Sequence, residues 1–182
     1  ITTEKEGPLI DIGHGSDVTL NIEGANEIVN RGIRVPNGSS LYLTGKGALK
    51  IHSEMQNSYA IGGDNESSYG NITIEYLAQL ILDITGENCV GIGGGKRASD
   101  SKISLMRTGI NLVCAGGNSV GIGSFSGNSN IEMRNCDLEF KMDCANAVGI
   151  GALKGETRVL MENFSLNIRE SGNNLCGVGV LN

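Results

Sequence analysis

The chain has no tryptophan, and aromatic residues make up only 4% of its 182 residues. A hydrophobic core must therefore be aliphatic, and the hydrophobic content of 39% is too high for a disordered chain. No apolar run approaches the roughly 18 residues that a membrane-spanning helix needs. We therefore expect no membrane insertion.

Positive charge is also scarce, with 14 Lys and Arg against 20 Asp and Glu and a net charge of −6. Proteins that bind nucleic acid usually carry a basic stripe, so we expect no nucleic-acid partner. The chain starts at Ile1 without a methionine, which we interpret as an excised or processed segment.

The cysteines are odd in number and form no Cys-x-x-Cys pair. Both facts argue against a disulfide framework and against a zinc site, so we expect small apolar core residues. The five are Cys89, Cys114, Cys136, Cys144 and Cys176.

Glycine is abundant, at 28 residues, and it recurs in a fixed phrase. Val-Gly-Ile-Gly occupies residues 90–93, 120–123 and 148–151, and altered copies stand at 59–62 and 176–179. Successive copies lie 28 to 31 residues apart. A phrase that returns at a nearly constant spacing is typical of stacked structural repeats.

Between the phrases, apolar and polar residues alternate with a period of two. Ile72 and Ile74 alternate with Thr73 and Glu75, for example, and corners rich in Gly, Asn and Ser separate such segments. This pattern indicates short half-buried strands, and no long stretch has helical periodicity.

Three strand segments in each repeat predict an all-β fold, a right-handed parallel β-helix with three faces and about six coils. We expect one domain over residues 1–182, with 1–9 as a lead-in or cap. The repeats begin near residues 10, 31, 59, 90, 120, 148 and 176. One inward ladder is expected to contain Ile12, Ile33, Ile61, Ile92, Ile122, Ile150 and Val178.

Three stretches carry a family resemblance: Gly-Ile-Gly-Gly-Gly at 91–95, Asn-Ile-Thr-Ile at 71–74, and residues 32–45, which look like an opening coil. They resemble β-solenoid repeat modules in surface and secreted proteins of Gram-positive bacteria. The resemblance implies an adhesin-like or carbohydrate-binding role outside the cell, secreted or attached to the cell wall. It carries over no catalytic residue.

Enzymatic chemistry finds little support in the residues. Gly13-His14-Gly15 matches a motif of polygalacturonase-like hydrolases, but these also need paired aspartates, and the chain has no Asp-Asp pair. His52 is expected to face outward without a partner. The loop from Asp64 to Glu66 is rich in oxygen ligands for calcium, although it lacks the spacing of known calcium loops. We predict no catalytic residue, no metal site and no cofactor, and leave calcium at this loop open.

Two surfaces remain as binding candidates. The first is the glycine positions of the repeated phrase, which strand alternation is expected to turn outward as bare backbone. The second is an outward row on the later strands, where we expect Ile81 and Val113 to lie side by side, exposed and ringed by charge. The predicted binding residues of this row are Ile81, Asp83, Asn111, Val113, Glu139, Lys141, Asn167 and Arg169.

These features favour a non-catalytic, adhesin-like module that contacts a host or environmental protein, such as an immunoglobulin or a mucin. A carbohydrate-binding module and a passive stalk are the alternatives. Sugar rings stack on aromatic side chains. With Tyr59 expected to point inward, only Tyr42, Tyr69 and Tyr76 are available for such stacking.

Overall fold

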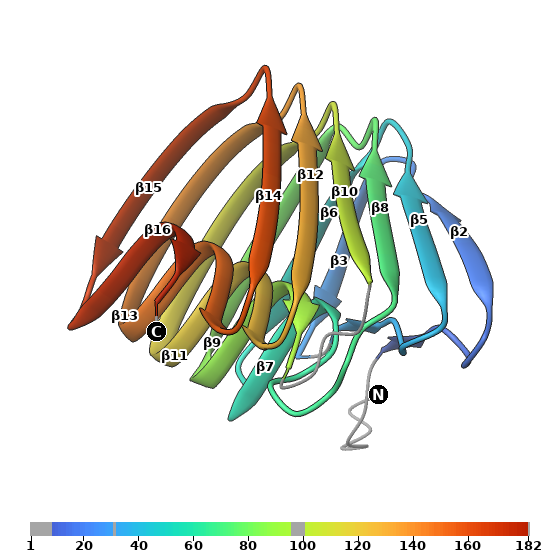
Figure 1. The fold of residues 1–182 in the computed structure, drawn as a ribbon. Coiled ribbons are helices and arrows are strands. Elements are labelled where there is room, and N and C mark those ends of the chain that lie inside the picture. The colour runs from blue at the N-terminus through green and yellow to red at the C-terminus, as the bar shows by residue number, and fades with distance from the viewer. Residues whose placement is uncertain (1–8, 31, 96–100, 182) are drawn as a thin grey trace.

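The chain folds into stacked coils of β-strand, as a computed structural model shows (Figure 1). The structure describes residues 9–30, 32–95 and 101–181, and these contain no helix. Residues 1–8 of the lead-in expected at 1–9 lie outside the described residues, as do residues 96–100, most of the segment 96–101 that we expected to be a loop.

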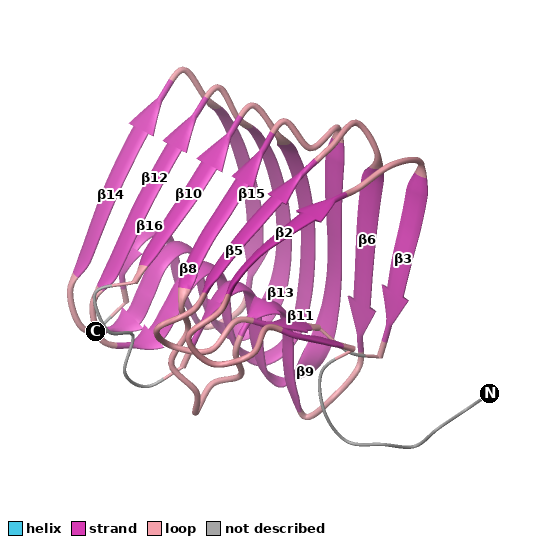
Figure 2. Ribbon diagram, turned by 90° about the vertical axis from the view of Figure 1, so that its right-hand side faces the viewer, coloured by secondary structure: helices cyan, strands magenta, loops and turns pink. Residues whose placement is uncertain are grey.

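The strands form two sheets in which neighbouring strands are parallel (Figure 2). The six-stranded sheet contains, in chain order, β2 (Asp17–Asn21), β5 (Ser40–Thr44), β8 (Asn71–Glu75), β10 (Lys102–Met106), β12 (Ser129–Arg134) and β14 (Thr157–Glu162). The ten-stranded sheet contains β1 (Ile10–Asp11), β3 (Ala25–Val29), β4 (Ile33–Arg34), β6 (Ala48–Ser53), β7 (Asn57–Gly62), β9 (Gln79–Gly94), β11 (Gly109–Ser126), β13 (Asp137–Lys154), β15 (Ser165–Ser171) and β16 (Asn174–Val180).

The winding is right-handed in both views, so the predicted parallel β-helix is confirmed (Figures 1 and 2). The chain makes five full turns between β2 and β14, the first and last strands of the six-stranded sheet. This is slightly fewer than the six coils expected, because six stacked strands enclose five complete turns.

The three faces are not always built from three separate strands. In the later coils, β9, β11 and β13 each run through a corner and supply two faces without a break. At this corner Gly116 lies so close to Gly86 that a Cβ on Gly116 would stand 1.7 Å from the Gly86 carbonyl oxygen. The expectation that a corner separates the strand segments everywhere was therefore wrong here, since glycine lets the strand bend without a break.

The core is a set of aliphatic ladders, as the shortage of aromatic residues predicts. In the six-stranded sheet one ladder consists of Val18, Leu41, Ile72, Ile103, Ile131 and Val159. The predicted phrase ladder is correct from Ile33 onward, but Ile10 pairs with Ile33 in place of Ile12. Ile12 is also buried, and its N–H donates to the Arg34 carbonyl oxygen one step further along.

The phrase glycines do not form an exposed face. Gly91 and Gly93 are buried with Val90 and Ile92, and the same holds for the next two copies. A Cβ on Gly93 would lie 1.8 Å from the carbonyl oxygen of Gly123 in the next coil. The first candidate surface is therefore contradicted, because these glycines are needed for the close approach of stacked coils and not for contact with a partner.

Side-chain amides form a second regular feature along the stack. Five coils each place an asparagine two residues before the phrase, and each of the last four donates through Nδ2 to Oδ1 of the one before it at 2.7 to 3.0 Å. The members of this asparagine ladder are Asn57, Asn88, Asn118, Asn146 and Asn174. The sequence contained the signal, since the same residue recurs at the same offset from the phrase.

Candidate functional site

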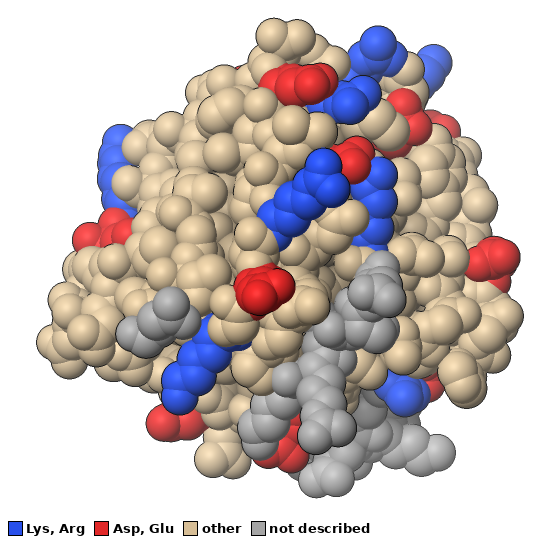
Figure 3. Space-filling model, viewed as in Figure 1, with Lys and Arg blue, Asp and Glu red and all other residues tan. Residues whose placement is uncertain are grey.

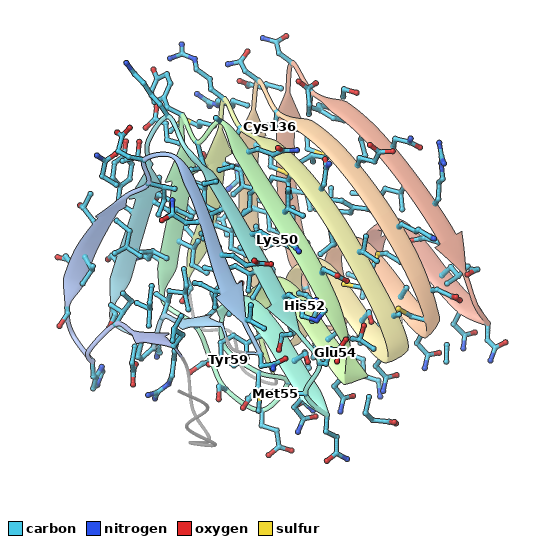
Figure 4. The ribbon with its side chains drawn as sticks, turned by 180° about the vertical axis from the view of Figure 1, so that it is seen from behind. Lys50, His52, Glu54, Met55, Tyr59 and Cys136 are labelled. Carbon is cyan, nitrogen blue, oxygen red and sulfur yellow. The ribbon has the colours of Figure 1, made fainter. Side chains whose placement is uncertain are left out.

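The predicted outward row lies on one surface of the solenoid, the surface that faces the viewer in Figure 4. We call this surface the long-strand face and define it as the outward positions of β3, β6 and β15 and of the first halves of β9, β11 and β13. Two columns of residues in register run along it. They are Glu27, Lys50, Ile81, Asn111, Glu139 and Asn167, and Val29, His52, Asp83, Val113, Lys141 and Arg169.

All eight predicted binding residues belong to these columns, so the structure brings them together on one face. One detail is different: Ile81 stands opposite Asn111, and Val113 stands opposite Asp83. Ile81 and Val113 are therefore diagonal neighbours two residues out of step, not side by side. Ile81 is half-buried, whereas Val113 is 40% exposed.

The charged side chains in the N-terminal half of the long-strand face have side-chain partners. Lys50 Nζ lies 2.9 Å from Glu27 Oε1, and this hydrogen-bonded carboxylate raises the pKa of Lys50. His52 was expected to have no partner, but its Nδ1 lies 3.0 Å from Asp83 Oδ2 and its Nε2 lies 3.2 Å from Glu54 Oε1. Pairing in register across β6 and β9 created the His52–Asp83 contact, which spans 31 residues and has no local signal.

The charged side chains in the C-terminal half of the same face lack such partners among the described residues. Glu139, Lys141 and Arg169 are exposed, and none of them forms an ion pair with another described residue. Lys141 stands opposite both Val113 and Arg169. An exposed apolar side chain is thus followed in its column by two stacked cations, of which arginine is a residue enriched in protein interfaces.

The six-stranded sheet differs, because two ion pairs bind four of its outward charges. Lys102 Nζ lies 2.8 Å from Glu132 Oε2, and hydrogen bonding to Lys102 lowers the pKa of Glu132. Arg134 Nε lies 3.2 Å from Glu162 Oε2. On this side of the molecule acidic and basic groups are interspersed (Figure 3), so no patch of one sign stands out there.

A broad cleft of about 1130 Å³ lies near the N-terminal end of the stack. Its lining includes Arg34, Met55, Tyr59 and Asp64, and the corner residues 53–57 connect it with the long-strand face (Figure 4). The lining also contains many polar groups: His14, Asn37, Gln56, Asn57, Glu66, Ser67 and Ser68.

Acidic groups act on two side chains that line this cleft, Arg34 and Tyr59. Asp11 Oδ2 lies 3.0 Å from Arg34 Nη1. Burial, and then the negative charge of Asp64, raise the pKa of the Tyr59 hydroxyl to about 12, so this group stays protonated and can donate a hydrogen bond. The Asp64 Oδ1 atom accepts hydrogen bonds from the N–H groups of Glu66 and Ser67 at 2.9 and 2.8 Å. The suggested calcium loop is therefore held by an Asx turn that uses one of its carboxylate oxygens.

The tyrosines are placed differently from expectation. Tyr59, expected to point inward, is half-buried and lines the cleft, whereas Tyr69, expected to be available to a sugar, is completely buried. Tyr76 is 50% exposed, but the guanidinium of Arg107 covers its ring at 4.9 Å from the centroid. The hydroxyl of Tyr42 donates to Glu75 at 3.0 Å.

The groups that could support catalysis or hold a metal are dispersed. His14 is exposed at the edge of the cleft. Among the residues that the structure describes, no three His, Cys, Asp or Glu side chains cluster in a way that would hold a metal ion. All five cysteines are free thiols; four are buried, and burial raises the pKa of Cys89 to about 12.

No family model, no curated protein and no solved structure matches this chain. In the described part of the chain, no helix is long and apolar enough to cross a membrane.

Proposed function

We propose that this chain is a non-catalytic binding module that contacts a protein partner through the long-strand face. The observation that supports this function is the C-terminal half of the face, where exposed Val113 stands opposite Lys141 and the column continues to Arg169, neither cation having an ion-pair partner among the described residues. Arginine is enriched in interfaces, and an apolar centre within a charged rim is their usual anatomy.

The partner has a definite chemistry under this proposal. It presents carboxylates to the two stacked cations and an aliphatic or aromatic group to Val113. The face is formed by backbone-paired strands and is held rigid, so binding requires little ordering of this chain. Together with the resemblance of the repeats, this favours an adhesin-like role in a secreted or wall-attached bacterial protein, toward a host or environmental protein.

The test uses immobilised immunoglobulin G and mucin as probes. We expect the wild-type chain to bind at least one of them, and Val113→Asp and Arg169→Glu each to weaken that binding about tenfold, since interface hot spots cost on the order of 1–2 kcal/mol or more. The matched control is Glu156→Lys, an exposed residue between β13 and β14 that lies away from the face. Equal binding by all variants would refute the role of this face.

A carbohydrate-binding function is the second candidate, and the cleft favours it. Tyr59 offers a ring beside amide, hydroxyl and charged groups, the combination that recognises sugar rings and their hydroxyls. A glycan array with hits that are lost in Tyr59→Ala and kept in Val113→Asp would favour this function. If the chain bound none of the proteins and glycans tested, the remaining hypothesis would be that it serves as a passive stalk.

A further inference from the structure

The cleft near the N-terminal end of the stack lies where the first coil takes a shorter path than the later coils. Three residues, 30–32, connect β3 with β4. The residues that pair with the ends of these two strands, His52 and Ile61, are separated by eight residues, and the later coils keep this longer spacing. The corner of the second coil therefore forms one wall of the cleft, which we call the corner wall. Its lining residues are Ser53, Met55, Gln56, Asn57 and Tyr59.

The asparagine ladder begins in the corner wall. Each later member donates through Nδ2 to Oδ1 of the asparagine in the preceding coil, and Asn57 accepts from Asn88 in this way at 2.8 Å. Among the described residues of the shorter first coil, none stands in register with Asn57. The oxygen and nitrogen of an amide diverge from Cγ, so Asn57 Nδ2 is directed away from Asn88, and no described residue accepts a hydrogen bond from it. The ladder thus presents an amide donor to the cleft.

Tyr59 and Met55 flank Asn57 at a distance of two residues on either side. Tyr59 is the next outward position of β7, about 7 Å further along the strand. Gly32 leaves room for its ring, since a Cβ on Gly32 would lie 2.9 Å from Tyr59 Cδ2. Met55 is 41% exposed, and Ser58 Oγ fixes its backbone by accepting from the Met55 N–H at 2.8 Å and lying 2.7 Å from the Met55 carbonyl oxygen. The groups of the corner wall are therefore held in place before any ligand arrives.

The ladder itself identifies the group that fits its open end. Every other Nδ2 donor of the ladder meets the oxygen of an amide, so a ligand that continues the ladder carries an amide oxygen. An acetamido group on a sugar supplies this oxygen. The sugar ring would then stack on Tyr59, as sugar rings do on aromatic side chains, and the acetamido methyl group would contact the adaptable thioether of Met55.

We infer that the cleft selects N-acetylated amino sugars through the open end of the asparagine ladder. Asn57 is the specificity-determining residue, because it recognises the acetamido group, whereas Tyr59 contacts any sugar ring. This inference rests on the carbohydrate-binding function proposed for the cleft, and it names the class of sugar.

Isothermal titration calorimetry with chitotetraose and cellotetraose tests the inference. These two tetrasaccharides have the same linkage and differ in carrying an acetamido group or a hydroxyl on each ring. We expect the wild-type chain to bind chitotetraose about tenfold more tightly, since one hydrogen bond and one methyl contact distinguish the two ligands. Asn57→Asp keeps an oxygen that accepts from Asn88 but has no donor for the acetamido group, so the preference should vanish. Tyr59→Ala should abolish binding of both tetrasaccharides.

Asn135→Asp is the matched control, because it makes the same substitution at an exposed corner between β12 and β13, far from the cleft. It should keep the preference of the wild-type chain. An unchanged urea midpoint shows that Asn57→Asp is folded. The side-chain amide signal of Asn57 in the nuclear magnetic resonance spectrum tests the contact without any substitution, since chitotetraose should shift this signal and cellotetraose should not.

Equal affinity for the two tetrasaccharides overturns the inference, as does a preference that survives in Asn57→Asp. In both cases loss of binding in Tyr59→Ala would still support a carbohydrate-binding cleft. If the chain binds neither tetrasaccharide, the inference is also overturned. None of these results bears on the long-strand face, which Val113→Asp reports separately.

Discussion

Substitution of Gly123 by alanine tests how the repeated phrase holds the coils together. Gly123 has a φ of 136°, and a Cβ there would lie 1.8 Å from the carbonyl oxygen of Gly151, far inside the 3.4 Å at which ordinary contact begins. Alanine can be accommodated only if the coils separate, which disrupts the parallel ladder on both sides.

Two costs add in this variant. The backbone conformation, which side chains other than glycine rarely adopt, costs about 1–3 kcal/mol. Forcing extra volume against a packed backbone costs about 1–3 kcal/mol more. We therefore expect Gly123→Ala to lower the free energy of unfolding by about 2–6 kcal/mol, a large part of the roughly 5–15 kcal/mol typical of a folded domain.

Two other glycines provide matched controls that separate these costs. Gly179 has a similar φ of 134°, but among the described residues no further coil stacks on it, and the nearest atom to its Cβ would be Cys176 Sγ at 3.5 Å. Gly179→Ala should therefore show only the backbone cost. Gly109 has no strained φ, and its Cβ would meet nothing closer than 3.9 Å, so Gly109→Ala should be neutral or stabilise by up to about 1 kcal/mol.

Urea unfolding followed by circular dichroism measures the order of the midpoints. Amide hydrogen exchange in β16 measures the local effect of Gly179→Ala, because a terminal coil can open without global unfolding. A loss in Gly123→Ala no larger than the loss in Gly179→Ala would refute the reasoning, since the contact with the next coil would then contribute nothing.

Three further predictions concern side chains. Asn118→Ala removes two hydrogen bonds of the asparagine ladder and should destabilise the fold by about 1–2 kcal/mol in the same urea assay, more than Asn174→Ala, which removes one. Burial raises the pKa of the Glu170 carboxyl, so the folded state binds its proton more tightly than the unfolded state. The free energy of unfolding therefore falls as the pH rises from the pKa of Glu170 in the unfolded state through its higher pKa in the folded state. Glu170→Gln should therefore raise the thermal midpoint at pH 7, with the difference vanishing once the carboxyl is protonated in both states. The four buried thiols should react with a thiol reagent only on unfolding, after half-buried Cys176, because burial raises the pKa of Cys89 to about 12; rapid labelling of all five in the native state would contradict this.

Much of the fold could be predicted because its information is local and repeated. Strand alternation between Ile72 and Glu75 recurs with other residues in every coil, and inward and outward positions follow from a period of two. Register could not be predicted as reliably. Ile10 and Ile12 both alternate correctly, and only backbone pairing with Ile33 selects Ile10.

The same limit applies to the candidate site. The eight residues of the outward row could be chosen from alternation, but their mutual positions depend on register, which makes Ile81 and Val113 diagonal neighbours. The partners of His52 are Asp83, which is 31 positions away, and Glu54, which lies in a corner, so no sequence pattern could predict these contacts. Tyr59 was expected to point inward and Tyr69 to be exposed, but Tyr59 lines the cleft and Tyr69 is buried. Neither residue lies in a clearly alternating stretch of sequence, and the cleft that exposes Tyr59 forms only when the coils stack.

The sequence by itself determined the architecture of this protein, because a nearly constant spacing and a period of two allow few other ways to bury an aliphatic core. Only the tertiary structure decided what the glycines do. Strand alternation predicted that these glycines face outward, but in the structure they are buried between stacked coils. A glycine has no side chain whose polarity could indicate its orientation. The carbonyl oxygen of Gly151, 1.8 Å from where a Cβ of Gly123 would stand, leaves no room for any other residue.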